Sequence, residues 1–66
     1  MNTQARIQIQ ACHIAGTFVN GNRSDAVQAL QDAPSLESAA LALTVASLLG
    51  KEDRASFLRA IFYRLD

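Results

Sequence analysis

Hydrophobic residues recur along most of the chain at intervals of three and four, the period of an amphipathic α-helix. The first such segment runs from about Thr3 to Val19. Its apolar residues fall on one helical face, made of Ile7, Ala11, Ile14, Ala15 and Phe18. The pattern therefore predicts a helix over this segment. Within it, Arg6–Gln10 alternates as a half-buried strand does, and a strand that pairs across a dimer stays open as an alternative.

Three short stretches with the chemistry of helix ends divide the rest of the chain. They are Asn20-Gly21-Asn22, Ala33-Pro34-Ser35 and Gly50-Lys51. Glycine is favoured just after a helix, where a positive φ is needed, and proline cannot continue a helix. We therefore expect Gly21 and Gly50 to follow helix ends with positive φ, and Pro34 to stop a helix.

Two more helices are predicted between these stretches. The first begins with Ser24 as its N-cap, with Asp25 near the positive helix end, and stops at Pro34. The second begins after Ser35, another N-cap candidate, and ends at Gly50. Ten of the fourteen residues from 36 to 49 are apolar. A helix that is apolar nearly all round is expected at the centre of the fold.

A fourth helix is predicted from about Glu52 to Leu65. Acidic Glu52 and Asp53 in its first turn and Arg64 in its last suit the helix dipole. Its apolar face consists of Phe57, Leu58, Ile61, Phe62 and Leu65. The sequence thus predicts an all-α fold, a small bundle of three to four short helices in one domain over residues 1–66.

Residues 11–34 resemble a single tetratricopeptide-type helical hairpin. Gly21 and Ala26 have the spacing at which that family ends one helix and packs the next against it, and Ala33-Pro34 matches its closing pair. Ile14 departs from the small residue that the family prefers, and the proline comes early. There is no second copy, although such repeats are normally stacked. The resemblance implies an antiparallel helix pair.

The amino-acid composition excludes several classes of protein and of functional site. Half of the residues are hydrophobic, and six Lys+Arg balance six Asp+Glu at a pI near 6.5, so neither a disordered tail nor a polyanion partner is indicated. One cysteine and one histidine cannot form a disulfide or a metal cage. Cys12 is expected to be a reduced, buried small hydrophobe. No signal-peptide core or membrane span is recognisable, so a cytoplasmic location is expected.

The third helix carries the candidate docking surface. One line at helical spacing bears its only charge and two leucines: Glu37, Leu41, Thr44 and Leu48. The core side is expected to be the opposite line of Ala39, Ala42, Ala46 and Leu49. Because so short a chain cannot easily cover both faces, the first line is predicted to contact a partner or a second copy. The alternative, that other helices of the same chain cover Leu41 and Leu48, stays open.

Arg59 and Tyr63 share a stripe of the fourth helix and are added to the predicted partner-binding residues. No phosphate-binding loop, nucleophile elbow or metal motif is present, so no catalytic residue, metal or cofactor is predicted.

We expect a non-catalytic helical interaction protein, an accessory factor or inhibitor acting as a homodimer. The alternative is a small helix-turn-helix DNA-binding regulator. Its arginines at 54, 59 and 64 are spread around the axis, whereas phosphate contacts need one face.

Overall fold

A computed structural model describes the backbone of residues 2–63 and the side chains of residues 2–61. Four helices occupy this part of the chain: α1 (Thr3–Val19), α2 (Arg23–Gln31), α3 (Ser35–Leu48) and α4 (Lys51–Tyr63). The described residues include no strand, so the all-α fold is confirmed and Arg6–Gln10 is helical. The predicted bounds of α1 are those observed. The residues predicted to end the fourth helix, Arg64 and Leu65, lie outside the described part.

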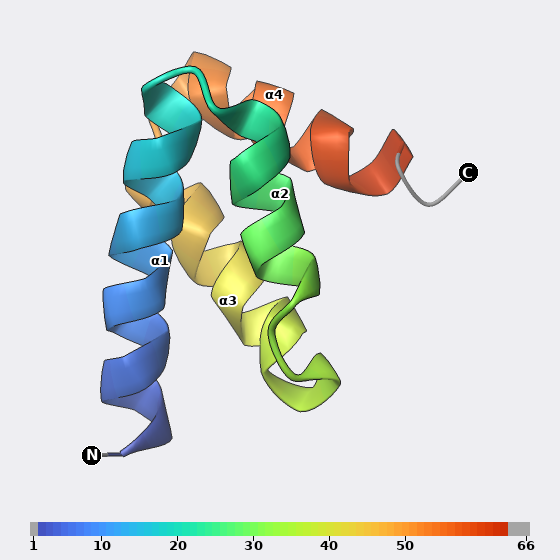
Figure 1. Ribbon diagram of the computed structural model, residues 1–66. Helices are drawn as coiled ribbons and strands as arrows, with labels where there is room; N and C mark the ends of the chain where they lie inside the picture. Colours follow the sequence, from blue (N-terminus) through green and yellow to red (C-terminus); the bar gives the residue numbers. More distant parts are fainter. Residues whose placement is uncertain (1, 64–66) are drawn as a thin grey trace.

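Helices α1 and α2 lie side by side and run in opposite directions, while α3 crosses behind them (Figure 1). Helix α4 runs past α2, and its C-terminal part projects beyond the other three helices. The most extensive contacts are those of α1 with α3 and α2. The antiparallel helix pair expected from the sequence is therefore present, with α3 covering it on one side.

The core is wholly apolar and joins all four helices. The fully buried large side chains are Phe18, Leu41, Val45 and Phe57. The rings of Phe18 and Phe57 meet edge to face with centroids 5.5 Å apart, a favourable aromatic geometry. This contact anchors α4 to α1. Cys12 was predicted to be buried but is exposed, because it lies just beyond the α1 face that packs on the core.

Gly21 ends α1 as predicted. Its φ is +100°, and the N–H groups of Gly21 and Asn22 donate to the carbonyls of Phe18 and Thr17. This pair of bonds is the Schellman arrangement, which satisfies the last carbonyls of a helix. The predicted N-caps, Ser24 and Ser35, lie two residues and one residue after the observed N-cap positions. Asn22 precedes α2 and Pro34 precedes α3, and neither makes a side-chain cap.

Helix α3 ends by a different means from the one predicted. Gly50 does not have a positive φ, and Leu49 is extended. Instead, the guanidinium of Arg54 reaches back from α4 and donates to the carbonyls of Ala46 at 3.1 Å and Leu49 at 3.4 Å. A cation at a helix C-terminus also complements the helix dipole. Arg54 therefore satisfies the end of α3, so a left-handed glycine is not needed there.

Replacing Gly21 by valine is expected to lower the free energy of unfolding by about 1 kcal/mol or more, because a β-branched residue resists positive φ. An added Cβ would meet no atom within 4 Å, so the loss would come from the backbone alone. Gly50→Ala is the matched control and should be close to neutral. Urea unfolding of both variants tests this, and equal stability of Gly21→Val and the parent protein would contradict the turn assignment.

Replacing Arg54 by alanine is expected to cost about 1 kcal/mol, since the carbonyls of Ala46 and Leu49 lose the guanidinium and Ala46 keeps only the N–H of Leu49 as donor. Arg59 is an exposed arginine on the same helix, and Arg59→Ala should change stability by less than about 0.5 kcal/mol. Thermal unfolding followed by circular dichroism compares the two variants. Equal losses would mean that Arg54 acts only as a surface charge.

Candidate docking surface

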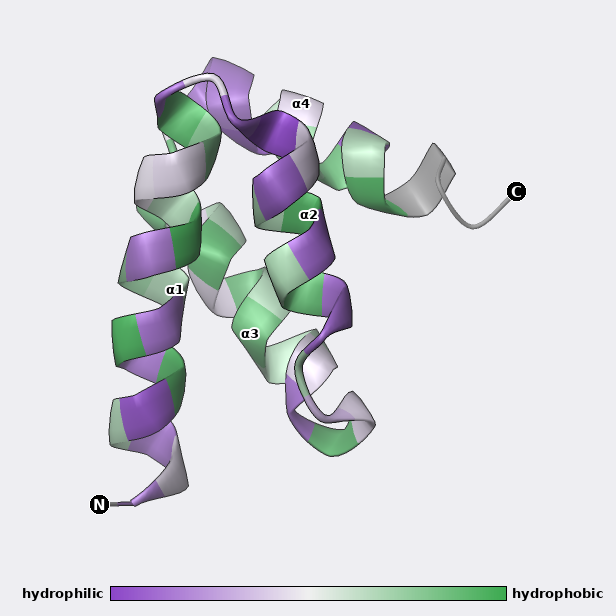
Figure 2. Ribbon diagram, in the orientation of Figure 1, coloured by the Kyte–Doolittle hydropathy of each residue, from purple (hydrophilic) through white to green (hydrophobic). Residues whose placement is uncertain are grey.

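The apolar residues of α3 form two surfaces. One is buried against the core through Leu41, Val45, Ala46 and Leu49. The other is exposed and consists of Leu36, Ala39, Ala40 and Leu43; together with the exposed Ser47 on the same side, we call it the outer face of α3. Leu36, Ala40, Leu43 and Ser47 follow one another at intervals of four, three and four, and Ala39 lies three residues after Leu36, so all five share one side of the helix. Leu36 is 97% exposed and Leu43 is 72% exposed. Figure 2 shows the apolar character of α3 beside the more polar α2.

The predicted orientation of α3 was only partly right. Ala46 and Leu49 are buried and Ala42 packs against the core, as expected, but two other residues lie on the side opposite to the one predicted. Leu41 was placed on the partner-facing line but is 0% exposed, because α3 packs against α1 on that side. Ala39 was placed on the core side but is exposed. The physical reason is that a helix apolar nearly all round has no preferred buried side of its own. Its neighbours decide which side is covered.

The predicted partner-binding residues do not form one continuous surface. Beside buried Leu41, Leu48 is 44% exposed. The hydroxyl of Thr44 donates to the carbonyl of Ala40, within the helix. Arg59 is exposed on α4, away from this line, and the side chain of Tyr63 lies outside the described residues.

Glu37, the remaining predicted partner-binding residue, is held by its own chain. Arg6 of α1 donates to both of its carboxylate oxygens at 3.0 and 3.1 Å, and only 17% of the Glu37 side chain is exposed. Both bonds come from the same guanidinium nitrogen, Nη2, and this charge-assisted contact ties the start of α3 to α1. Because α3 carries no other ionisable residue, its outer face presents neither a positive nor a negative charge.

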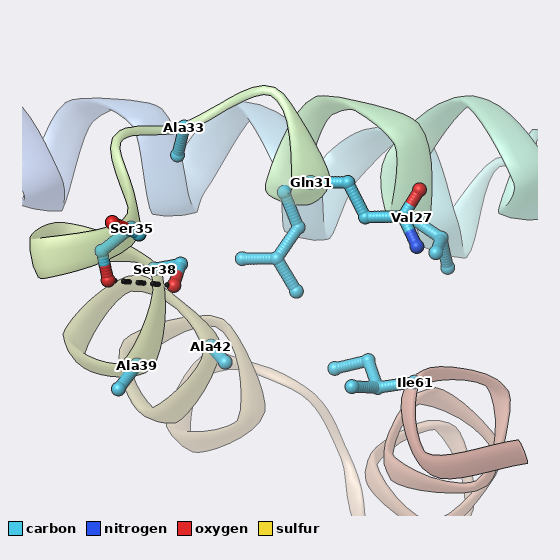
Figure 3. A pocket seen from close by; sticks show the side chains of 9 residues that line it. Val27, Gln31, Ala33, Ser35, Ser38, Ala39, Ala42 and Ile61 are labelled. Carbon is cyan, nitrogen blue, oxygen red and sulfur yellow. Dashed lines mark hydrogen bonds between the residues drawn. The ribbon is translucent and has the colours of Figure 1, made fainter. Parts of the chain in front are cut away.

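A groove lies beside the outer face, between α2, α3 and α4, with a volume of about 340 Å³ (Figure 3). We call it the α2–α3–α4 groove. Its apolar lining consists of Val27, Leu30, Ala33, Ala39, Ala42 and Ile61. Gln31, Ser35 and Ser38 complete the lining, and the Ser38 hydroxyl donates to the carbonyl of Ser35. No lining residue is charged. Ala39 belongs both to the groove and to the outer face.

Sequence reasoning missed both the outer leucines and the groove. Leu36, Ala40, Leu43 and Ser47 have the same spacing as the line that was chosen, and they carry no charge. The absence of a charge from this line was the signal that could have identified it as the exposed one. A line that contains an ionisable residue such as Glu37 can instead be held by an ion pair within its own chain. The groove had no signal in the sequence, because it exists only once α2, α3 and α4 pack together and bring Ile61 of α4 beside the α2–α3 pair.

The structure brings together little that could perform chemistry. Within residues 2–61, no three His, Cys, Asp or Glu side chains gather as a metal site would require. His13 is exposed and lines a second hollow of about 330 Å³ between α1 and α2, with Ile9, Gln10, Ile14 and Ala29. Neither hollow contains a nucleophile paired with a base.

None of the four described helices has both the length and the hydropathy to cross a membrane. No family model, curated protein or solved structure matches the chain.

Truncating Leu41 to alanine is expected to cost about 2–5 kcal/mol, because it opens a cavity in the core. The same truncation at Leu43, two residues further along the helix and on the outer face, should change stability by less than about 0.5 kcal/mol. Both variants lose the same atoms from the same helix, so the comparison isolates burial. Urea unfolding measures the difference. A larger loss at Leu43 than at Leu41 would contradict the orientation of α3.

Proposed function

We propose that the protein is a non-catalytic interaction protein that docks the outer face of α3 on another protein molecule. The observation that carries the proposal is the exposure of Leu36 and Leu43 on one uncharged helix side. Each leucine side chain gains about 1.5–3 kcal/mol when it is fully buried, and neither obtains this gain within the single chain. A protein partner that covers both leucines recovers it.

Size and composition suggest the kind of role. A small domain whose described side chains, residues 2–61, assemble no catalytic group can act by occupying a surface of a larger protein, as an accessory factor or an inhibitor does. Self-association into a homodimer is part of the proposal, since an apolar patch on a protein of zero formal net charge meets no long-range repulsion from its own copy. The proposed location is the cytoplasm.

The arrangement of cations gives less support to the alternative, a DNA-binding regulator of helix-turn-helix type. Arg6 is paired with Glu37, Arg54 donates to the end of α3, and Arg23 lies 5.1 Å from the ring centre of Phe18. Lys51 and Arg59 are exposed on α4. A phosphate-tracking surface needs several cations on one exposed face, and three of the five described cations contact their own chain.

The proposal is tested with the double change Leu36→Glu, Leu43→Glu. We expect the parent protein to form a complex, either with itself in light scattering or with a protein retained from a lysate of its source organism. The double variant should lose that same complex while keeping its helical circular dichroism. The complex should also persist at high salt, because burial of apolar surface is not screened.

The matched control is Ile9→Glu, Val19→Glu, which changes two exposed apolar residues of α1 in the same way. This control should keep the complex. Equal loss in both double variants, or no complex formed by the parent protein in either measurement, would overturn the proposal. Binding to duplex DNA that weakens steeply with added salt would favour the regulator instead.

A further inference from the structure

The turn between α1 and α2 contains two residues, Asn20 and Gly21, that can react with each other. The backbone nitrogen of a glycine has little steric cover, because the residue carries no Cβ. It can therefore approach the side-chain amide of a preceding asparagine more readily than the nitrogen of another residue can. Asparagine is also one of the thermolabile residues of proteins. The turn thus joins a reactive amide to an accessible nucleophile.

The reaction between these groups is a cyclisation followed by hydrolysis. Once a base in solution has removed its proton, the Gly21 nitrogen attacks Cγ of Asn20. A C–N bond forms, the Cγ–Nδ2 bond breaks, and the side-chain nitrogen takes a proton from water and leaves as ammonia. Water then opens the succinimide ring. Opening at Cγ gives aspartate at position 20, and opening at the backbone carbonyl carbon gives isoaspartate.

The reacting groups are open to the water that both steps need. Asn20 and Gly21 are exposed, and no atom lies within 4 Å of the point where a Cβ of Gly21 would sit. The chain has two other asparagines, Asn2 and Asn22, which precede a threonine and an arginine. A side chain shields the following nitrogen at both of these positions. Asn20 is therefore the asparagine with the most accessible nucleophile.

The backbone of the turn opposes the cyclisation. Asn20 has a ψ of 0°, so the nitrogen of Gly21 eclipses the backbone nitrogen of Asn20 and is turned away from its Cβ. A five-membered ring closes only when the attacking nitrogen is turned toward Cβ, which carries Cγ. The N–H of Gly21 also donates to the carbonyl of Phe18 at 3.1 Å, which holds its proton in place. Cyclisation therefore requires the turn to open and ψ of Asn20 to rotate.

We propose that Asn20 is a site of spontaneous deamidation, which the Schellman arrangement at the end of α1 suppresses and which proceeds when the turn opens. The isoaspartate product acts back on the turn. Its backbone runs through the former side chain, which adds an atom to the chain between residues 20 and 21. The two hydrogen bonds of the Schellman arrangement then lose their spacing. Modification converts a transient opening into a lasting loss of this helix end.

The test compares the folded and the unfolded protein in the same warm, mildly alkaline buffer, without and with guanidinium chloride. Mass spectrometry of tryptic peptides follows the replacement of the amide NH₂ by a hydroxyl group, and fragmentation separates Asn20 from Asn22. Asn20 should be modified about tenfold faster or more in the unfolded chain, a factor that corresponds to about 1.4 kcal/mol of turn stability. Asn2 and Asn22 are internal controls and should change more slowly than Asn20 in the unfolded chain.

Two variants separate the chemistry from its effect on the turn. Gly21→Ala, measured in guanidinium chloride, should slow the modification of Asn20, because a Cβ shields the attacking nitrogen. The isoaspartate product, isolated and returned to native buffer, should melt at a lower temperature than Asn20→Asp, which adds the same charge without lengthening the backbone.

Each part of the proposal has its own contrary result. Modification of Asn20 no faster than that of Asn22 in the unfolded chain, or no slower in Gly21→Ala, would overturn the site. Equal rates in the folded and the unfolded protein would overturn the protection by the turn. Equal melting temperatures of the isoaspartate product and Asn20→Asp would overturn the effect on the helix end.

Discussion

The packing of α3 across α1 is the contact on which the rest of the molecule depends. Leu41 and Val45 are completely buried, and they fix how far α3 is turned about its own axis. Two polar contacts hold the helix in that orientation. The Arg6–Glu37 pair fastens its start to α1, and Arg54 binds the carbonyls at its end. Because this orientation buries one apolar side, it leaves the other side, with Leu36 and Leu43, in water.

The same contacts shape the charge of the surface. Arginines that could have formed a basic patch are directed to groups of their own chain, at Glu37, at the ring of Phe18 and at the end of α3. Pairing within the chain lowers the charge that a partner encounters. The neutral chain and its uncharged apolar helix face support the proposed docking through buried surface in preference to ionic attraction.

The small size of the chain limits how much apolar surface its own fold can bury. A chain of this length buries a smaller fraction of its surface than a larger domain does, and each exposed leucine is apolar area that does not stabilise the monomer. An apolar exterior side is costly in water unless another molecule covers it. The groove between α2, α3 and α4 adds further apolar surface beside the outer face, since Ala39 belongs to both.

Local sequence chemistry determined which segments of the chain form helices and approximately where each helix begins and ends. The apolar spacing of α1, the left-handed Gly21 and the break at Pro34 act within a few residues, so each was predictable from the sequence. Tertiary structure decided the rest. Arg54 reaches α3 across a turn, which replaced the expected role of Gly50. The buried side of α3 was predictable only in part: Ala46 and Leu49 are in the core as expected, but the burial of Leu41 was not foreseen. Apolar residues distributed around a helix leave its orientation open until α1 packs against it. The outer face and the groove follow from that packing.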